Sequence, residues 1–261
     1  MMKNSISILG SGWLGLPLID MFVKQGYAVK ASTRNIDKLP LLSQHGATGY
    51  IVDTQLAIPK DFLDSETLII NITGKDFDAY QKLALAIASS PVQKVLMVSS
   101  TSVYLNLNRQ VSEDEAAENP DSALWQIEQL LQTHEGFTTT IVRFSGLIGG
   151  RRHPGRFFSQ GKVISQPLAP VNLIHLDDCL GIIDAIIQQQ SWGEVYNGCA
   201  DFHPAKREFY GYWAAQLGLP EPKSLDDDTP QDWKIVSNQK VQQRLAYQFI
   251  HPDLYRLSFD D

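Results

Sequence analysis

A glycine-rich turn near the start of the chain has the residue types and spacing that bind a dinucleotide. Residues 6–9 read as a short apolar strand, and Gly10, Gly12 and Gly15 then supply the pattern G-x-G-x-x-G. The first glycine permits a tight turn, the second lets a pyrophosphate approach the backbone, and the third allows helix and strand to pack closely. An ordinary glycine turn of another α/β protein is the alternative. We predict cofactor contacts from Gly10, Ser11, Gly12, Trp13, Leu14 and Gly15, with the anion on the N–H groups at the helix start.

The residues about twenty positions beyond the glycines favour NADP over NAD. Domains that prefer NAD usually carry Asp or Glu there, which binds the ribose 2′-hydroxyl. Here the chain reads A-S-T-R at 31–34. Thr33 can hydrogen-bond and Arg34, helped by Lys38, can pair with a 2′-phosphate, although a solvated surface arginine is the alternative. We predict NADP(H), with NAD as the second possibility; Asp53 either accepts a bond from the adenine amino group or caps the next segment.

Composition and charge restrict the classes of partner. Of 261 residues, 43% are hydrophobic and 20% are charged, which is ordinary for a globular protein, and no apolar run reaches the ~20 residues that span a bilayer. The net charge of −7 argues against a protein-wide attraction to nucleic acid. Cys179 and Cys199 lack metal-ligand spacing and are typical of buried thiols in a reducing cytoplasm. We expect a cytoplasmic protein with a small-molecule substrate, no metal, no membrane and no nucleic acid; the sequence does not indicate an oligomeric state.

Short apolar strands alternate with amphipathic helices over the first half of the chain. This order predicts βαβ units and a doubly wound parallel sheet, a Rossmann fold of the α/β class. Polar residues that follow or end such strands lie where open sheets bind ligands, so Thr73 and Ser99 complete the predicted cofactor contacts. The expected strands are residues 6–9, 27–32, 49–52, 68–72, 95–98 and 139–142, and the expected helices are 36–44, 77–88 and 123–131.

The regular alternation ends near Gly146, and the remainder predicts a small C-terminal substrate lobe. We assign residues 1–143 and 173–197 to the NAD(P)-binding Rossmann domain and residues 144–172 and 198–261 to the smaller lobe. The helix expected over 204–217 carries Phe209, Trp213 and Leu217 at helical spacing, a stripe that fits a core face better than an interface. The other elements expected here are helices over 177–188 and 238–245 and a strand over 193–197.

Four segments in the same order resemble one enzyme family. The residues S-S-T-S-V-Y at 99–104 resemble the S-S-x-x-V-Y segment of the extended short-chain dehydrogenase/reductases, the NAD-dependent epimerase/dehydratase family. The segments V-R-F at 142–144, I-H-L-D-D at 174–178 and V-Y-N at 195–197 resemble further parts of that family, and the match is closest to its compact, atypical nucleoside-diphosphate-sugar epimerase subgroup. The resemblance implies an NAD(P)-dependent oxidoreductase or epimerase acting on a small polar substrate such as a nucleotide sugar.

The family's acid–base pair is missing from this chain. In the family, a Y-x-x-x-K pair exchanges a proton with the substrate and a serine holds the substrate oxygen; the serine corresponds to Ser100 here. None of the nine tyrosines is followed by lysine four residues later, and two possible registers place the pair at Trp125 and Gln129 or at residues 120 and 124. A neutral tyrosine without a nearby cation is a poor base at pH 7. The resemblance leaves Ser100 and Tyr104 as the catalytic candidates.

Other groups could assist proton transfer or bind substrate. His175 and Lys75 are further proton-transfer candidates, although His175 fits a structural role in the loop before its helix better. A basic cluster in an otherwise acidic chain predicts a phosphate-binding site, and a solvated loop is the alternative. Without the acid–base pair, a non-catalytic NADP(H)-binding sensor or scaffold is the second functional hypothesis. The substrate-binding candidates are Arg143, Arg151, Arg152 and Arg156, with His153 and Lys162 nearby.

Overall fold

The computed structural model describes residues 5–159, 161–225 and 232–259. The chain divides into two compact units, which we describe separately. The first contains Met1–Val103, Asn119–Arg143 and Ile186–Val195. The second contains Tyr104–Glu118, Phe144–Ala185 and Tyr196–Asp261. This division differs from our domain boundaries mainly at residues 104–118 and 173–185, and the boundaries themselves remain a prediction.

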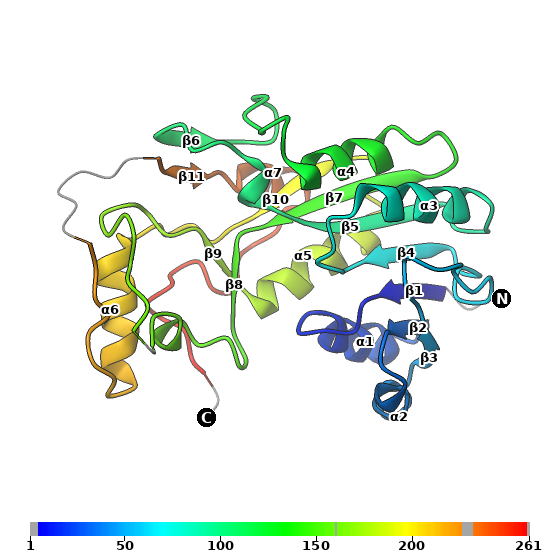
Figure 1. Cartoon of the computed structure of the whole chain (residues 1–261), viewed down its shortest axis with the longest axis horizontal. Coiled ribbons are helices and arrows are strands. Elements are labelled where there is room, and N and C mark those ends of the chain that lie inside the picture. Colours follow the sequence, from blue (N-terminus) through cyan, green and yellow to red (C-terminus); the bar gives the residue numbers. More distant parts are fainter. Residues whose placement is uncertain (1–4, 160, 226–231, 260–261) are drawn as a thin grey trace. The chain divides into compact units, whose positions relative to one another are not determined.

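A seven-stranded sheet forms the centre of the fold, in the order β3-β2-β1-β4-β5-β7-β10 (Figure 1). The pairs β2–β3, β1–β2, β1–β4 and β4–β5 are all parallel. The chain reverses its direction of travel across the sheet between β3 and β4, so the carboxyl ends of β1 and β4 flank the point where open α/β sheets bind ligands. The predicted Rossmann fold is therefore confirmed. The strands are β1 Ser5–Leu9, β2 Ala28–Thr33, β3 Thr48–Ile51, β4 Thr67–Ile70, β5 Lys94–Ser100, β7 Thr138–Phe144 and β10 Val195–Gly198.

Amphipathic helices cover the sheet. Helix α1 packs against β1 and β2, α2 packs against β3, and α4 packs against both α3 and β5. Side chains that precede two of these helices cap them: Asp76 accepts a bond from the N–H of Ala79 at 3.1 Å, and Ser122 accepts one from the N–H of Trp125 at 3.4 Å. The helices are α1 Gly15–Lys24, α2 Leu39–Gln44, α3 Phe77–Ala88, α4 Ala123–Gln132 and α5 Leu176–Gln188, with short 3₁₀ turns at Ile36–Lys38 and Thr101–Val103.

Two short strand pairs in the second unit were not predicted from the sequence. Strand β6 (Arg109–Val111) pairs in parallel with β11 (Lys234–Val236), and β8 (Gly146–Ile148) pairs in parallel with β9 (Leu173–His175). Each strand has only three residues, which is too short for a periodic pattern to be read. The same unit contains α6 Lys206–Gln216, α7 Gln239–Arg244 and a 3₁₀ turn at Pro154–Arg156.

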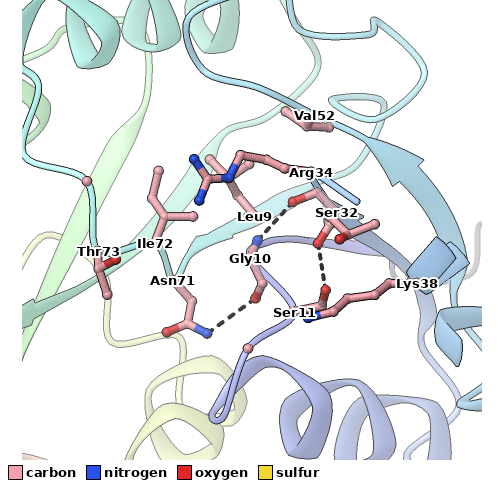
Figure 2. Close-up of a pocket in the computed structure, with 13 residues that line it drawn as sticks. Leu9, Gly10, Ser11, Ser32, Arg34, Lys38, Val52, Asn71, Ile72 and Thr73 are labelled. Carbon is pink, nitrogen blue, oxygen red and sulfur yellow. Dashed lines mark hydrogen bonds between the residues drawn. The ribbon is translucent and has the colours of Figure 1, made fainter. Parts of the chain in front are cut away.

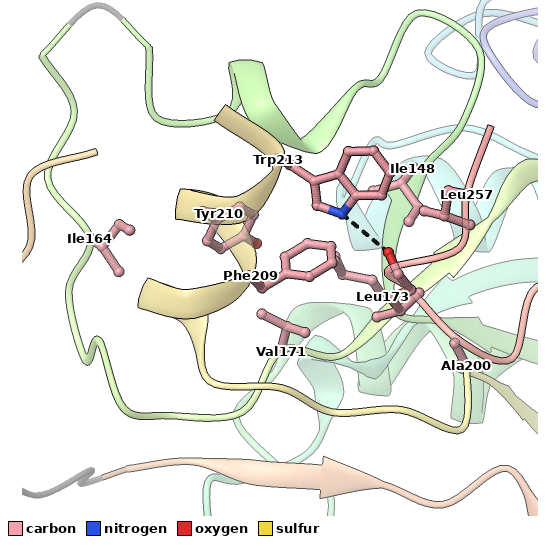
Figure 3. Packing of buried hydrophobic residues seen from close by; sticks show 10 residues of the cluster. Ile148, Ile164, Val171, Leu173, Ala200, Phe209, Tyr210, Trp213 and Leu257 are labelled. Carbon is pink, nitrogen blue, oxygen red and sulfur yellow. Dashed lines mark hydrogen bonds between the residues drawn. The ribbon is translucent and has the colours of Figure 1, made fainter. Parts of the chain in front are cut away.

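The second unit has its own apolar core around helix α6 (Figure 3). Phe209 and Trp213 are buried there, which confirms the core interpretation for these two residues of the stripe, whereas Leu217 is half-buried. The indole N–H of Trp213 donates to the carbonyl of Leu254 at 3.1 Å, so the C-terminal segment is fixed to this helix. The buried residues of the cluster are Ile148, Ile164, Val171, Leu173, Ala200, Phe209, Tyr210, Trp213, Leu254 and Leu257.

Both cysteines are buried and free, as predicted. Burial raises the pKa of the Cys199 thiol to about 12, which makes it unreactive as a nucleophile. Within the part of the chain that the structure describes, no helix combines the length and the apolar character needed to cross a membrane.

Candidate functional site

The three glycines of the turn between β1 and α1 differ in their surroundings. Gly10 has a φ of +105°, which side-chain-bearing residues rarely adopt, and an added Cβ would collide with the carbonyl of Asn71. A Cβ on Gly15 would collide with the carbonyl of Gly10. A Cβ on Gly12 would meet nothing within 4 Å. Gly10 and Gly15 are therefore needed by the turn itself, whereas Gly12 leaves open space beside the backbone.

Helix α1 begins at this turn without a side-chain cap, and the N–H of Leu16 in its first turn donates to the Gly12 carbonyl at 3.1 Å. Leu14 precedes the helix and offers no side-chain cap, and the first turn of α1 contains no acidic residue. The first N–H groups of a helix have no partner within the helix and carry partial positive charge. This arrangement suits a bound anion such as a pyrophosphate.

A cavity of about 410 Å³ opens beside the turn at the carboxyl ends of β1, β2 and β4 (Figure 2). Ser32 holds the glycine turn against β2. The Ser32 hydroxyl accepts a bond from the N–H of Gly10 at 2.9 Å, and the Ser32 carbonyl accepts one from the Ser11 hydroxyl at 2.8 Å. Arg34 and Lys38 bring two cationic side chains to the lining. The residues that line the cavity are Leu9, Gly10, Ser11, Gly12, Ser32, Thr33, Arg34, Lys38, Val52, Asn71, Ile72, Thr73 and Gly74.

Several predicted cofactor contacts have other partners. The Thr33 hydroxyl accepts a bond from the N–H of Asn35 at 3.1 Å, so it also shapes the turn after β2. Asp53 accepts a bond from the N–H of Gln55 at 3.0 Å, which is the capping role, and Val52 takes the place in the cavity lining. Asn71, which was not predicted, also lines the cavity, and its amide donates to the Gly10 carbonyl at 3.3 Å. Its position could have indicated this role, because Asn71 is a polar residue directly after the apolar strand β4.

A buried polar network lies beneath the end of β5. Glu128 of α4 and Arg143 of β7 form an ion pair at 2.6 Å, and their side chains are 0% and 2% exposed. The Nε of Arg143 also donates to both carboxylate oxygens of Glu128, at 3.2 and 3.1 Å. The Ser99 hydroxyl donates to the same carboxylate. Arg143 and Ser99 thus have partners within the protein, and their predicted contacts with substrate and cofactor stay predictions.

The two catalytic candidates have different surroundings. The hydroxyl of Ser100, which is half-buried at the end of β5, accepts a bond from the N–H of Ser102 at 3.1 Å. The buried phenol of Tyr104 donates to the side-chain carbonyl of Asn197 at 2.9 Å. The amide of Asn197 in turn donates to the carbonyl of Ser237 at 3.1 Å. The phenol proton of Tyr104 is therefore already donated in a hydrogen bond within the second unit.

Glu113, a carboxyl group beside Asn197, has a shifted pKa. Glu113 accepts a bond from the N–H of Asn197 at 2.7 Å. Burial raises the pKa of Glu113, because desolvation disfavours its charged form more than the hydrogen bond and Lys240 favour it.

The basic cluster predicted from the sequence divides between different places. Arg151 and Arg156 line a cavity of about 460 Å³ in the second unit, together with His153, Trp213 and Phe259. The remaining lining residues are Gly150, Gln216, Leu217 and Leu257. Two guanidinium groups beside aromatic rings can bind an anionic group that carries a planar ring.

Other basic residues of the cluster lie elsewhere. Arg152 is exposed, and its backbone pairs with that of Gly149. Lys162 lines a separate cavity of about 270 Å³. His153 accepts a bond from the N–H of Gly155 at 3.1 Å, and burial together with the positive charge of Arg156 lowers its pKa. A neutral His153 therefore leaves Arg151 and Arg156 as the cations of their cavity.

Comparisons with known proteins agree with this geometry. A family described as NAD(P)H-binding matches residues 10–168. The protein YeeZ of Escherichia coli (strain K12) is 30% identical over 267 residues, which cover 96% of this chain and 97% of YeeZ.

Solved structures share the fold across almost the whole chain. UDP-glucuronic acid 4-epimerase from Bacillus cereus, in complex with NAD, is 17% identical with a TM-score of 0.78, over 96% of this chain and 93% of that one. The human epimerase family protein SDR39U1, with NADPH, is 15% identical with a TM-score of 0.70, over 96% of both chains. At these identities the likeness concerns the fold alone.

Proposed function

Because the chain belongs to the NAD(P)H-binding family and has the fold of epimerase-like short-chain dehydrogenase/reductases, we propose that it is an NADP(H)-dependent oxidoreductase or epimerase of a small anionic substrate. The observation that carries the proposal is the pair of cations, Arg34 and Lys38, in the cavity beside Gly12. Enzymes that prefer NAD usually have a carboxylate after β2, which would repel a 2′-phosphate. Arg34 offers instead a planar fork that can bind that phosphate through two hydrogen bonds.

The cavity lined by Arg151 and Arg156 supports the anionic substrate class. Trp213 and Phe259 provide aromatic surface beside the two cations, and their rings pack edge to face at 5.2 Å. A nucleoside diphosphate sugar combines a planar base with two phosphates and would use both features. We therefore propose this cavity as the site for the charged part of the substrate.

In the proposed reaction, NADPH supplies a hydride and the protein must supply a proton. Ser100 would hold the substrate oxygen, since it is the residue that corresponds to the family serine. Tyr104 can provide the proton only if its bond to Asn197 is exchanged for one to substrate. We therefore expect turnover of common sugar nucleotides with NADPH to be slow.

A second candidate, an NADP(H)-binding sensor without catalysis, is favoured by the buried network at the end of β5. Glu128 and Arg143 satisfy each other's charges, and Tyr104 donates to an amide. Tight NADPH binding without NADPH oxidation over a broad panel of carbonyl substrates would support this second candidate. Turnover that Ser100→Ala weakens would support the enzyme.

The cofactor part is tested by titrating the protein with NADPH and NADH. Arg34→Ala should cost about 1.5–3 kcal/mol of NADPH affinity, which is the usual size of a charge-assisted hydrogen bond, and should leave NADH affinity unchanged. Arg109→Ala is the matched control, because Arg109 is an exposed arginine paired with Glu115 in the second unit. Equal affinity for both cofactors, or no loss in Arg34→Ala, would overturn the preference for NADP(H).

A further inference from the structure

Two histidines and one carboxylate meet at the beginning of α5 in the second unit. His175 ends β9, Asp177 lies in the first turn of α5, and His251 belongs to the C-terminal segment. The Nδ1 of His175 lies 3.3 Å from Oδ2 of Asp177, and the Nε2 of His251 lies 2.9 Å from the same oxygen. One ligand atom from each of the three residues lies within 4.8 Å of the other two.

This donor set matches the ligands of one class of metal ion. Imidazole nitrogens with a carboxylate suit Zn²⁺ and related transition-metal dications, whereas Mg²⁺ and Ca²⁺ prefer oxygen ligands. Ligand atoms bound tetrahedrally at about 2.0–2.2 Å from Zn²⁺ lie roughly 3.3–3.5 Å from one another. The distances between Asp177 and the two histidines are close to that spacing. A dication bound by the three ligand atoms, which lie within 4.8 Å of one another, would keep its fourth position for water.

The neighbouring residue Asp178 holds the C-terminal segment in place. Its carboxylate accepts bonds from the N–H groups of Ile250 at 2.7 Å and His251 at 3.0 Å, and from the Tyr247 hydroxyl at 3.0 Å. Asp178 is fully buried, whereas the side chain of Asp177 is 50% exposed. The two consecutive carboxylates therefore have different partners. Asp178 fixes the backbone of His251, and the Asp177 carboxylate faces the two imidazoles.

The orientation of His175 favours a metal ligand. The Nδ1 of His175 lies 3.3 Å from both the N–H and the carboxylate Oδ2 of Asp177, so a cation bound at this nitrogen would take the place of the N–H contact. Its Nε2 lies against Gly149, where an added Cβ would come within 2.6 Å. In the tautomer that can bind a metal, Nδ1 is unprotonated, and it then faces the Asp177 carboxylate oxygen, a second acceptor, at 3.3 Å. A cation shared between them would be a partner for both acceptors, in exchange for the long N–H contact of Asp177.

We propose that His175, Asp177 and His251 bind one Zn²⁺-class dication, which links the C-terminal segment to the beginning of α5. This segment supplies Leu254 and Leu257 to the core of the second unit. Metal binding should therefore stabilise the folded chain, because a ligand that binds only the folded state raises its stability by mass action.

The test uses the full chain, treated with a chelator and then dialysed. Titration with Zn²⁺ by calorimetry should show one site, and Co²⁺ should give the visible absorption of a tetrahedral complex at the same stoichiometry. His251→Ala should weaken Zn²⁺ binding by more than the roughly 10–100-fold that changes to outer-shell partners cost. Excess Zn²⁺ should raise the Tm of the wild type and leave that of His251→Ala unchanged.

Two further variants keep the test decisive. Asp177→Asn preserves the shape of a half-exposed side chain and should also weaken Zn²⁺ binding, without the risk of disturbing the buried His175. His45→Ala is the matched control, since His45 and Asp20 form a pair at 2.6 Å in the first unit, where the described residues provide no third ligand within the same cluster. Absence of saturable binding, or a single Zn²⁺ that His251→Ala and Asp177→Asn do not affect, would overturn the proposal.

Discussion

The glycine-turn cavity and the polar network beneath the end of β5 contain similar chemical groups in opposite situations. In the cavity, Arg34 and Lys38 lie beside open space at Gly12 and beside the uncapped start of α1. In the network, Arg143 pairs with Glu128 and both side chains are almost completely buried. An arginine that lines a cavity can exchange water for a ligand, whereas an arginine with a buried partner cannot leave it without exposing a charge to an apolar interior. The surroundings of an arginine, more than its residue type, therefore determine whether it can bind a ligand or serves the fold.

The largest expected effect is a loss of protein stability when the ion pair between Glu128 and Arg143 is broken. Glu128→Ala leaves the Arg143 charge buried without its carboxylate and should lower the free energy of unfolding by about 3–5 kcal/mol. The double variant Glu128→Met with Arg143→Met should recover most of this loss, because it removes both charges. Denaturant unfolding measures both. If the folded double variant bound NADPH much more weakly than the wild type, the network would belong to the ligand site and the comparison would fail.

Cofactor binding should respond most strongly to Gly12. A valine there finds open space and a φ outside the left-handed region, so Gly12→Val should fold normally while its side chain occupies the path of the pyrophosphate. We expect NADPH affinity to fall by about 100-fold or more, a loss of at least ~2.7 kcal/mol. Gly211→Val is the control, because a Cβ on Gly211 also meets nothing within 4 Å. Retained binding in folded Gly12→Val would mean that the glycine pattern is only a turn.

The variant Tyr104→Phe distinguishes a structural role of the phenol from a catalytic one. Tyr104→Phe removes the donor to Asn197 and should cost about 0.5–1.5 kcal/mol of stability, measured by thermal or denaturant unfolding. Where turnover is found, a general acid contributes about 10²–10⁴-fold to the rate. A fall of about 10²–10⁴-fold in kcat, with the free energy of unfolding nearly unchanged, would show that the phenol acts in the reaction and does not only hold Asn197.

The smallest expected effect concerns Glu113. Since burial raises its folded-state pKa, the protonated form is favoured by folding, and the resulting stability is lost as the pH rises through that pKa. Glu113→Gln keeps an acceptor for the N–H of Asn197 and has no charge to desolvate. Its stability relative to the wild type should therefore increase between about pH 4 and pH 7. Unfolding curves that differ by the same amount at both pH values would contradict this assignment.

Local patterns in the sequence predicted the fold and half of the candidate site. The glycine spacing, the strand before it and Arg34 after β2 all lie within one βαβ unit, whose geometry depends on neighbouring residues and is therefore readable in order along the chain. The α6 stripe of Phe209 and Trp213 was similarly readable, because helical periodicity determines which side chains share a face.

Contacts between residues far apart in the chain could not be predicted from the sequence. Arg143 was a substrate-binding candidate in the sequence, and only the packing of β7 beside α4 identifies Glu128 as its partner. The pairing of β6 with β11 and the approach of His251 to His175 also depend on contacts between segments far apart in the chain. No local propensity encodes such contacts. The sequence therefore determined the sheet, its glycine turn and the charge beside it, while tertiary packing decided which polar groups stay open to a ligand, because burial is a property of the whole fold.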